Sequence, residues 1–134
     1  MEDKRKAKTV KYTVVESDDV VAALFLRTGM PIMAHVVINP DWRVFNALIG
    51  CEYASMADTK VPGLHLWIDD VGAVSGEKRI NSMASVIAGQ PIWGDALLIG
   101  LNDIGETRSV TEEEAFSAVE IIANAIDRRL NEDR

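Results

Sequence analysis

The chain has 134 residues, which is the length of one ordinary domain, and 48% of them are hydrophobic while 26% are charged. That balance is enough to bury a core, so the composition excludes wholesale disorder. The sequence contains no apolar run of the roughly 20 residues that a membrane-spanning helix needs, and its charged first residues do not resemble a signal peptide. With Cys51 as its one cysteine, we expect a cytoplasmic protein that does not bind membranes.

Charge is distributed unevenly along the chain. The formal net charge is −7, but the first eleven residues carry five cations and two anions, a local +3, which leaves −10 for the other 123 residues. We expect residues 1–8 to form a basic arm and residues 9–134 to form a single domain. An acidic body disfavours nucleic-acid binding. The acidic charge would serve either to bind a basic partner or only to keep the protein in solution. The basic arm is either a binding element or a solvated terminus.

The first half of the chain predicts several strands and one helix. Residues 9–15 alternate and are β-branched, which favours a strand, whereas the apolar residues 20–26 fit a short helix or a buried strand equally well. Residues 31–39 and 51–56 are further strand candidates. Between them, residues 41–49 have the spacing of a helix that ends at Gly50, with its apolar face made by Trp42, Phe45, Leu48 and Ile49.

The second half ends in the clearest prediction. Residues 64–70 and 96–101 are predicted strands, residues 70–76 a turn with a short returning segment, residues 81–88 a helix, and residues 102–108 a turn. Two capping-box spacings, one beginning at Ser109 and one at Thr111, precede an amphipathic helix of about 18–20 residues. Its apolar stripe consists of Phe116, Val119, Ile122, Ala123, Ile126 and Leu130. We therefore predict an α+β fold: a small, mostly antiparallel sheet with short helices on one side and one long C-terminal amphipathic helix.

Residues that bind metals or act as nucleophiles are few and scattered. His35, Cys51 and His65 lack the paired spacing of a zinc site, and the sequence has neither a nucleophile motif nor a phosphate-binding loop. Asp69 and Asp70 fit either a hairpin turn or, together with Glu77, a divalent cation site; the turn is favoured. We expect no catalytic residue, no cofactor and no metal.

One segment suggests a ligand. Lys78 and Arg79 are cations in an acidic body, and Asn81 stands at a predicted helix start. Together with Trp67 they would bind a nucleotide-like molecule by charge and stacking. The alternative is structural: Asn81 caps the helix, and the two cations are solvated.

The order of several short segments resembles an uncharacterised family of phages, plasmids and bacterial genomes, domain of unknown function 3846. The resemblance covers about residues 45–114 and rests on Ile49-Gly-Cys-Glu-Tyr53, Leu66-Trp-Ile-Asp-Asp70, Arg79-Ile-Asn-Ser-Met-Ala84, Ile92-Trp-Gly-Asp-Ala-Leu-Leu-Ile-Gly100, Gly105-Glu106 and Ser109-Val-Thr-Glu-Glu-Glu114. It implies a small α+β domain with an Asn-x-x-Ala element, encoded by a mobile element and acting in the host cytoplasm.

These observations favour a non-enzymatic phage or mobile-element protein. It would bind a host component or a small nucleotide-like signal, and so counteract antiviral defence by sequestration. The alternatives are an interaction module without a ligand, an acidic inhibitor of a basic host protein, and an enzyme built from His65, Asp69 and Glu52. Three tryptophans, at 42, 67 and 93, exceed what so small a core needs, so we also expect a homo-oligomer.

Overall fold

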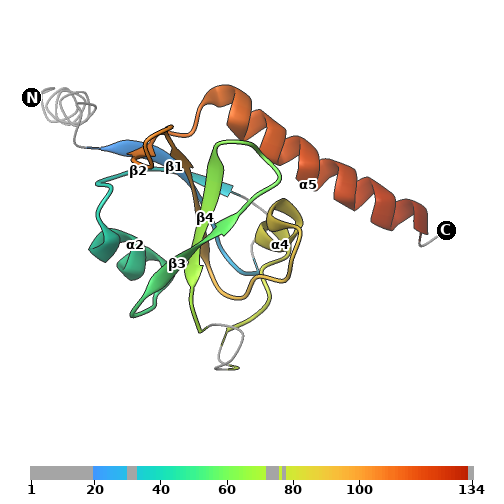
Figure 1. Ribbon diagram of the computed structural model, residues 1–134. Helices are drawn as coiled ribbons and strands as arrows, with labels where there is room; N and C mark the ends of the chain where they lie inside the picture. The colour runs from blue at the N-terminus through green and yellow to red at the C-terminus, as the bar shows by residue number, and fades with distance from the viewer. Residues whose placement is uncertain (1–19, 30–32, 72–75, 77, 133–134) are drawn as a thin grey trace, which may run out of the picture.

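The computed structural model describes residues 20–29, 33–71, 76 and 78–132 (Figure 1). This part of the chain forms one six-stranded antiparallel sheet with the order β2-β1-β5-β4-β3, in which β6 pairs with β5 beyond the start of β1. The strands are β1 (Val21–Leu26), β2 (Met33–Ile38), β3 (Ala54–Asp58), β4 (Leu64–Asp69), β5 (Ala96–Leu101) and β6 (Thr107–Arg108). The predicted α+β class, with its long C-terminal helix, is confirmed.

The apolar segment of residues 20–26, which fits a helix or a strand by sequence, forms the strand β1. It pairs antiparallel with β2 on one side and with β5 on the other, and four of its six residues are buried. Because a strand in the middle of a covered sheet is apolar on both faces, it lacks the alternation by which a strand is recognised. The sequence alone therefore could not separate this strand from a buried helix.

Helices cover both faces of the sheet, so the expectation of helices on one side only was wrong (Figure 1). On one face, Leu98 of β5 packs in the same cluster as residues of α4 (Ser82–Ala88) and α5 (Glu112–Glu132). On the opposite face, Leu97 and Ile99 pack with Phe45 and Ile49 of α2 (Trp42–Ile49). The central strand β5, with five of its six residues buried, demands this arrangement because each of its two faces needs an apolar cover.

The two short helices begin and end much as the sequence predicts. Asp41 caps α2 by accepting a hydrogen bond from the amide of Arg43, and Gly50 ends this helix with a φ of 76°, which favours glycine. The predicted apolar face of α2 is only partly right. Phe45 and Ile49 are buried, whereas Trp42 is 62% exposed.

The N-terminus of α5 is fixed by one of the two predicted capping boxes. Thr111 Oγ1 accepts from the amide of Glu114 at 3.1 Å, and Glu114 Oε1 accepts from the amide of Thr111 at 3.0 Å. Ser109 has a different partner: its hydroxyl accepts a hydrogen bond from the amide of Ala22 at 2.9 Å and so joins this loop to β1.

Two strand boundaries differ from the predictions. The strand expected at residues 51–56 is β3 and begins three residues later, because the chain first turns after Gly50, where Cys51 and Glu52 form a bend. The turn expected over residues 102–108 contains the short strand β6 at its end. The predicted arm at residues 1–8, the strand at residues 9–15 and most of the segment returning after Asp70 lie outside the described residues. None of the described helices has the length and apolarity that crossing a membrane requires.

Candidate functional site

The four residues expected to bind a ligand do not gather at one place. Lys78 lies at the end of α2, where its ammonium donates to the carbonyl oxygens of Gly50 at 2.9 Å and Ile49 at 3.3 Å and lies 3.5 Å from a carboxylate oxygen of Asp69. A cation in this position stabilises the negative end of the helix dipole and occupies carbonyls that the helix leaves unpaired. Its positive charge is thus already used within the fold.

Asn81 is a structural residue and only 1% exposed. Its side-chain amide donates to the carbonyls of Leu26 and Gly94, both at 2.9 Å, while its oxygen accepts from the amide of Ala84 at 3.1 Å. One side chain therefore caps α4 and joins it to the ends of β1 and β5. The cap interpretation is confirmed, and both amide donors are already satisfied.

Trp67 lies apart from this cap, whereas the backbone of Arg79 adjoins it through Gly94. Trp67 packs on the α2 face of the sheet, with its ring centroid 5.2 Å from that of Phe45, whereas Asn81 caps a helix on the opposite face. The buried indole nitrogen of Trp67 finds no acceptor among the described residues. The side chain of Arg79 is exposed, and its carbonyl accepts from the amide of Gly94. Trp67 and Lys78 therefore lie on the α2 side of the sheet, while Asn81 lies on the α4 side.

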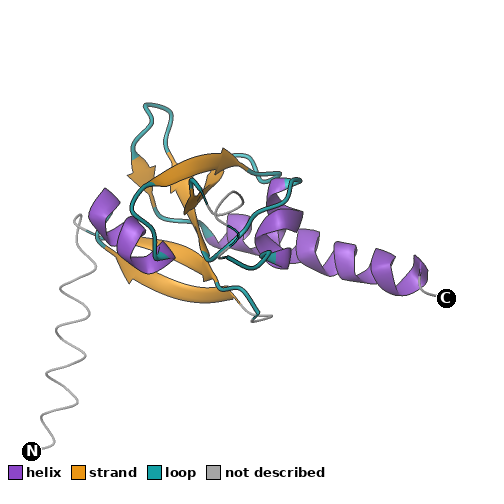
Figure 2. Cartoon of the chain, turned by 90° about the horizontal axis from the view of Figure 1, so that it is seen from below, coloured by secondary structure: helices purple, strands orange, loops and turns teal. Residues whose placement is uncertain are grey.

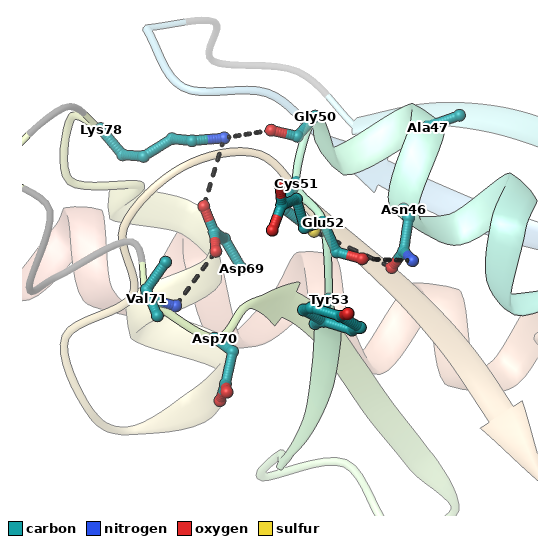
Figure 3. Close-up of a pocket in the computed structure, with 10 residues that line it drawn as sticks. All are labelled: Asn46, Ala47, Gly50, Cys51, Glu52, Tyr53, Asp69, Asp70, Val71 and Lys78. Carbon is teal, nitrogen blue, oxygen red and sulfur yellow. Dashed lines mark hydrogen bonds and ion pairs between the residues drawn. The ribbon is translucent and has the colours of Figure 1, made fainter.

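A cavity of about 520 Å³ opens where α2 ends, between that helix and the ends of β3 and β4 (Figure 3). Of the four candidates, Lys78 lines it, with Glu52, Asp69 and Asp70 as its acidic residues. Cys51 is half-buried there. Burial and the nearby carboxylate of Asp69 raise the pKa of its thiol, which keeps the sulfur protonated and weakly nucleophilic.

Asp69 and Asp70 begin a turn at the end of β4, while most of the returning segment of the favoured hairpin lies outside the described residues. Asp69 accepts from the amide of Val71 at 3.0 Å, which is the local bond of an Asx turn, and its other oxygen faces Lys78 (Figure 3). Glu77 lies outside the described residues. Within the described ranges, no three His, Cys, Asp or Glu side chains cluster as a metal site requires. His35 lies on the exposed edge strand β2, and Nδ1 of His65 is 3.5 Å from Asp58.

The most distinctive surface belongs to α5. This helix packs against the sheet and α4 through small and branched residues: Ala118 is fully buried, and Ala115, Ile121 and Ile122 lie against the same core cluster. Figures 1 and 2 show that the C-terminal half of α5 runs past the sheet and extends beyond the rest of the fold. Much of this 21-residue helix therefore has solvent, rather than protein, around it.

Beside this buried face runs a second apolar face, which is exposed. We call it the α5 stripe and define it as Phe116, Val119, Ala123, Ile126 and Leu130. Phe116 is 69% exposed, Leu130 58%, Ile126 56% and Val119 50%. The steps of three and four residues place these side chains on one line along the helix, which is the pattern of a helix that contacts another helix. Of the six stripe residues predicted from the sequence, Ile122 packs against the core and the other five are exposed.

The stripe continues into a groove of about 460 Å³ between α4 and α5. Met83 and Val86 form its α4 wall, and Ile122, Ala125 and Ile126 form much of its α5 wall. Leu130 closes it beside Arg129, which is the one cation among the described residues of this lining. Because Ile126 and Leu130 belong to both the stripe and the groove, the two form a single apolar surface.

Acidic side chains border the opposite flank of the stripe. We call them the acidic row: Glu113, Glu120 and Asp127, all of them exposed and spaced by seven residues. Seven residues are almost two helical turns, so the three carboxylates line up. The surface of α5 thus runs from a buried face, through an exposed apolar stripe, to a negatively charged edge.

Comparison with known proteins gives a likeness of fold only. No protein-family model and no curated protein matches the chain. Among solved structures, the crystal structure of the small RNA methyltransferase HEN1 matches 84% of this chain with a TM-score of 0.59 and 17% sequence identity. The match spans 18% of the HEN1 chain, so the shared part is a small portion of that protein. The resemblance to domain of unknown function 3846 stays a prediction.

The apolar residues of α5 are evident in the sequence, but the division of the helix into two apolar faces is not. The sequence signal for a second face is given by Ala115, Ala118 and Ala125. These alanines lie beside the large residues of the stripe on the helix surface, not among them. Small residues permit close packing of a helix on a sheet, so they indicate the side of α5 that faces the core. The α4 wall of the groove had no such signal, because Met83 and Val86 fit an ordinary core equally well.

Proposed function

We propose that this chain acts by binding another protein, and that its binding surface is the α5 stripe together with the α4–α5 groove. The observation that carries this proposal is the row of large apolar side chains, each at least half exposed, along a helix that extends beyond the fold. Soluble domains rarely expose contiguous apolar surface of this kind unless a partner covers it. An amphipathic helix beside a groove is also a common geometry for the recognition of another helix.

This proposal selects among the functions expected from the sequence. It keeps a non-enzymatic protein that binds a host component, in the phage or mobile-element setting that the family resemblance implies. It gives less weight to sequestration of a nucleotide-like signal, because Trp67 and Asn81 lie on opposite faces and Lys78 is engaged within the fold. Detection of a bound nucleotide by native mass spectrometry would restore that alternative.

The name of the structural neighbour suggests RNA methylation, which we do not propose for this chain. The match covers a small part of HEN1, and such a likeness speaks only to the fold. The net charge of −7 also disfavours contact with RNA phosphates, which depends on clustered Lys and Arg.

Site-specific photocrosslinking tests the proposed surface. A benzophenone amino acid is placed at Val119 in the stripe or, as a matched control, at Asn124, which is exposed on the polar side of the same helix. In cells of the organism that carries the gene, we expect protein adducts at Val119 but not at Asn124, and we expect Ile126→Glu to suppress them. Equal adducts at both positions, or none at Val119, would contradict the proposal.

A further inference from the structure

The acidic row indicates the chemistry of the partner. We infer that the α5 surface binds an amphipathic helix that presents Lys or Arg along one flank, with its apolar side on the stripe. This inference rests on the proposed function and adds the charge of the partner. Three sets of observations support it: the extent of the apolar surface, the charge along its flank and the poor fit of a second copy.

The first observation is the extent of the apolar surface. The stripe runs from Phe116 to Leu130, which is about four turns of helix at 3.6 residues per turn. Across its other flank, Met83 and Val86 of α4 continue the apolar surface as the wall of the groove. A helix lying along α5 would therefore contact two walls, which fixes its direction better than one exposed face would.

The second observation is the charge along the stripe. Glu120 lies four residues after Phe116, and Asp127 lies four residues after Ala123, so each carboxylate is next to a stripe residue on the helix surface. A partner helix seated on the stripe would place its own flank opposite these carboxylates. Lys or Arg there would form ion pairs at the edge of the contact, whereas Asp or Glu would be repelled.

The third observation concerns a second copy of this chain. In an antiparallel pair of α5 helices, matching flanks face each other, so one acidic row would meet the other. In a parallel pair, the acidic row would face the opposite flank of the stripe, which carries Ala115, Ile122 and Arg129. Arg129 is the one cation of these three, and the body of each copy is strongly acidic. The charge pattern thus favours a basic partner over self-association.

The test uses the full-length protein and two designed helical peptides of equal length and equal apolar side. One carries Lys along the flank and the other Glu. Fluorescence anisotropy is expected to show at least about tenfold tighter binding of the Lys peptide, which is the effect of a few exposed ion pairs. Because these pairs are exposed, about 0.5 M NaCl should remove most of the preference.

Matched variants decide whether the acidic row causes the preference for the Lys peptide. The triple variant Glu113→Gln, Glu120→Gln and Asp127→Asn should lose the preference for the Lys peptide. A control triple variant removes the same net charge from exposed positions elsewhere: Glu52→Gln, Asp70→Asn and Asp103→Asn. This control should retain the preference for the Lys peptide. Ile126→Ser should weaken binding of both peptides.

The outcomes separate this inference from the proposed function. Equal binding of both peptides, or binding of neither, would overturn the basic partner. Adducts at Val119 in the crosslinking experiment would still support the docking surface in that case. If light scattering shows a dimer that Ile126→Glu dissociates, the stripe is occupied by a second copy, and the inference is wrong.

Discussion

The guanidinium of Arg108 donates two parallel hydrogen bonds to the carboxylate of Glu114, at 2.8 and 2.7 Å. Arg108 belongs to β6 and Glu114 to the first turn of α5, so this pair holds the long helix to the sheet. The Arg108 hydrogen bonds are the largest cause that lowers the pKa of Glu114 from 4.5 to about 2, with the Thr111 amide contributing, while burial opposes the change. Together with the core packing of Ala118, this contact holds α5 in place on the sheet.

Because the folded protein holds Glu114 at a lower pKa than the unfolded chain does, ionised Glu114 stabilises the fold above about pH 4.5. This contribution is lost as the pH falls from 4.5 towards 2. We expect Glu114→Gln to lower the free energy of unfolding at pH 7 by about 1–3 kcal/mol. Urea denaturation should show the gap between variant and wild type narrowing steadily below pH 4.5. A gap independent of pH would show that the carboxylate charge does not contribute.

Gly100 leaves room for the Arg108 side chain. A Cβ at this position would lie 2.5 Å from Nη1 and 2.9 Å from Cζ of Arg108, so Gly100→Ala must displace the guanidinium. We expect a loss of about 1–3 kcal/mol in the free energy of unfolding, because the bonds to Glu114 are disturbed. The loss should be much smaller in a Glu114→Gln background. Additive effects of the two substitutions, measured as a double-mutant cycle, would contradict this coupling.

Asn81 was expected to bind a ligand, and its geometry predicts a different phenotype. Asn81→Ala removes the cap of α4 and leaves the carbonyls of Leu26 and Gly94 without their buried donors. We expect destabilisation of about 2–4 kcal/mol, measured by urea denaturation. Ser82→Ala, one residue later and exposed, is the matched control and should change stability by less than about 0.5 kcal/mol. A fully stable Asn81→Ala protein would show that the cap contributes little.

How far the sequence predicts this protein depends on whether a signal is local. The ends of α2, α4 and α5 were predicted well, because capping by Asp41, Asn81 and Thr111 is decided within a few residues. Two other features could not be predicted: that residues 20–26 form a strand, and that helices cover both faces of the sheet. Both depend on strand pairing across the sheet. The arrangement of the candidate site residues could not be predicted for the same reason: the fold places Trp67 on the α2 face of the sheet and Asn81 at the cap of α4 on the other face.

Substitutions on the two faces of α5 should differ in their effect on the free energy of unfolding. Ala118 is completely buried against the core, so Ala118→Leu would overpack this contact and should lower the free energy of unfolding by about 1–3 kcal/mol. Val119, the next residue, is half exposed, and Val119→Ser should change stability by less than about 0.5 kcal/mol. If the stripe is the binding surface, Val119→Ser should nevertheless weaken binding of the Lys peptide, since it removes apolar contact area.

Urea denaturation of both variants, combined with the anisotropy measurement, distinguishes a packing role from a binding role. Loss of stability in Val119→Ser would mean that the stripe packs against the protein itself. Wild-type binding of the Lys peptide by a stable Val119→Ser protein would mean that this position lies outside the contact. The expected combination is a stable fold with weaker binding, because a residue selected for recognition contributes to the complex rather than to the isolated domain.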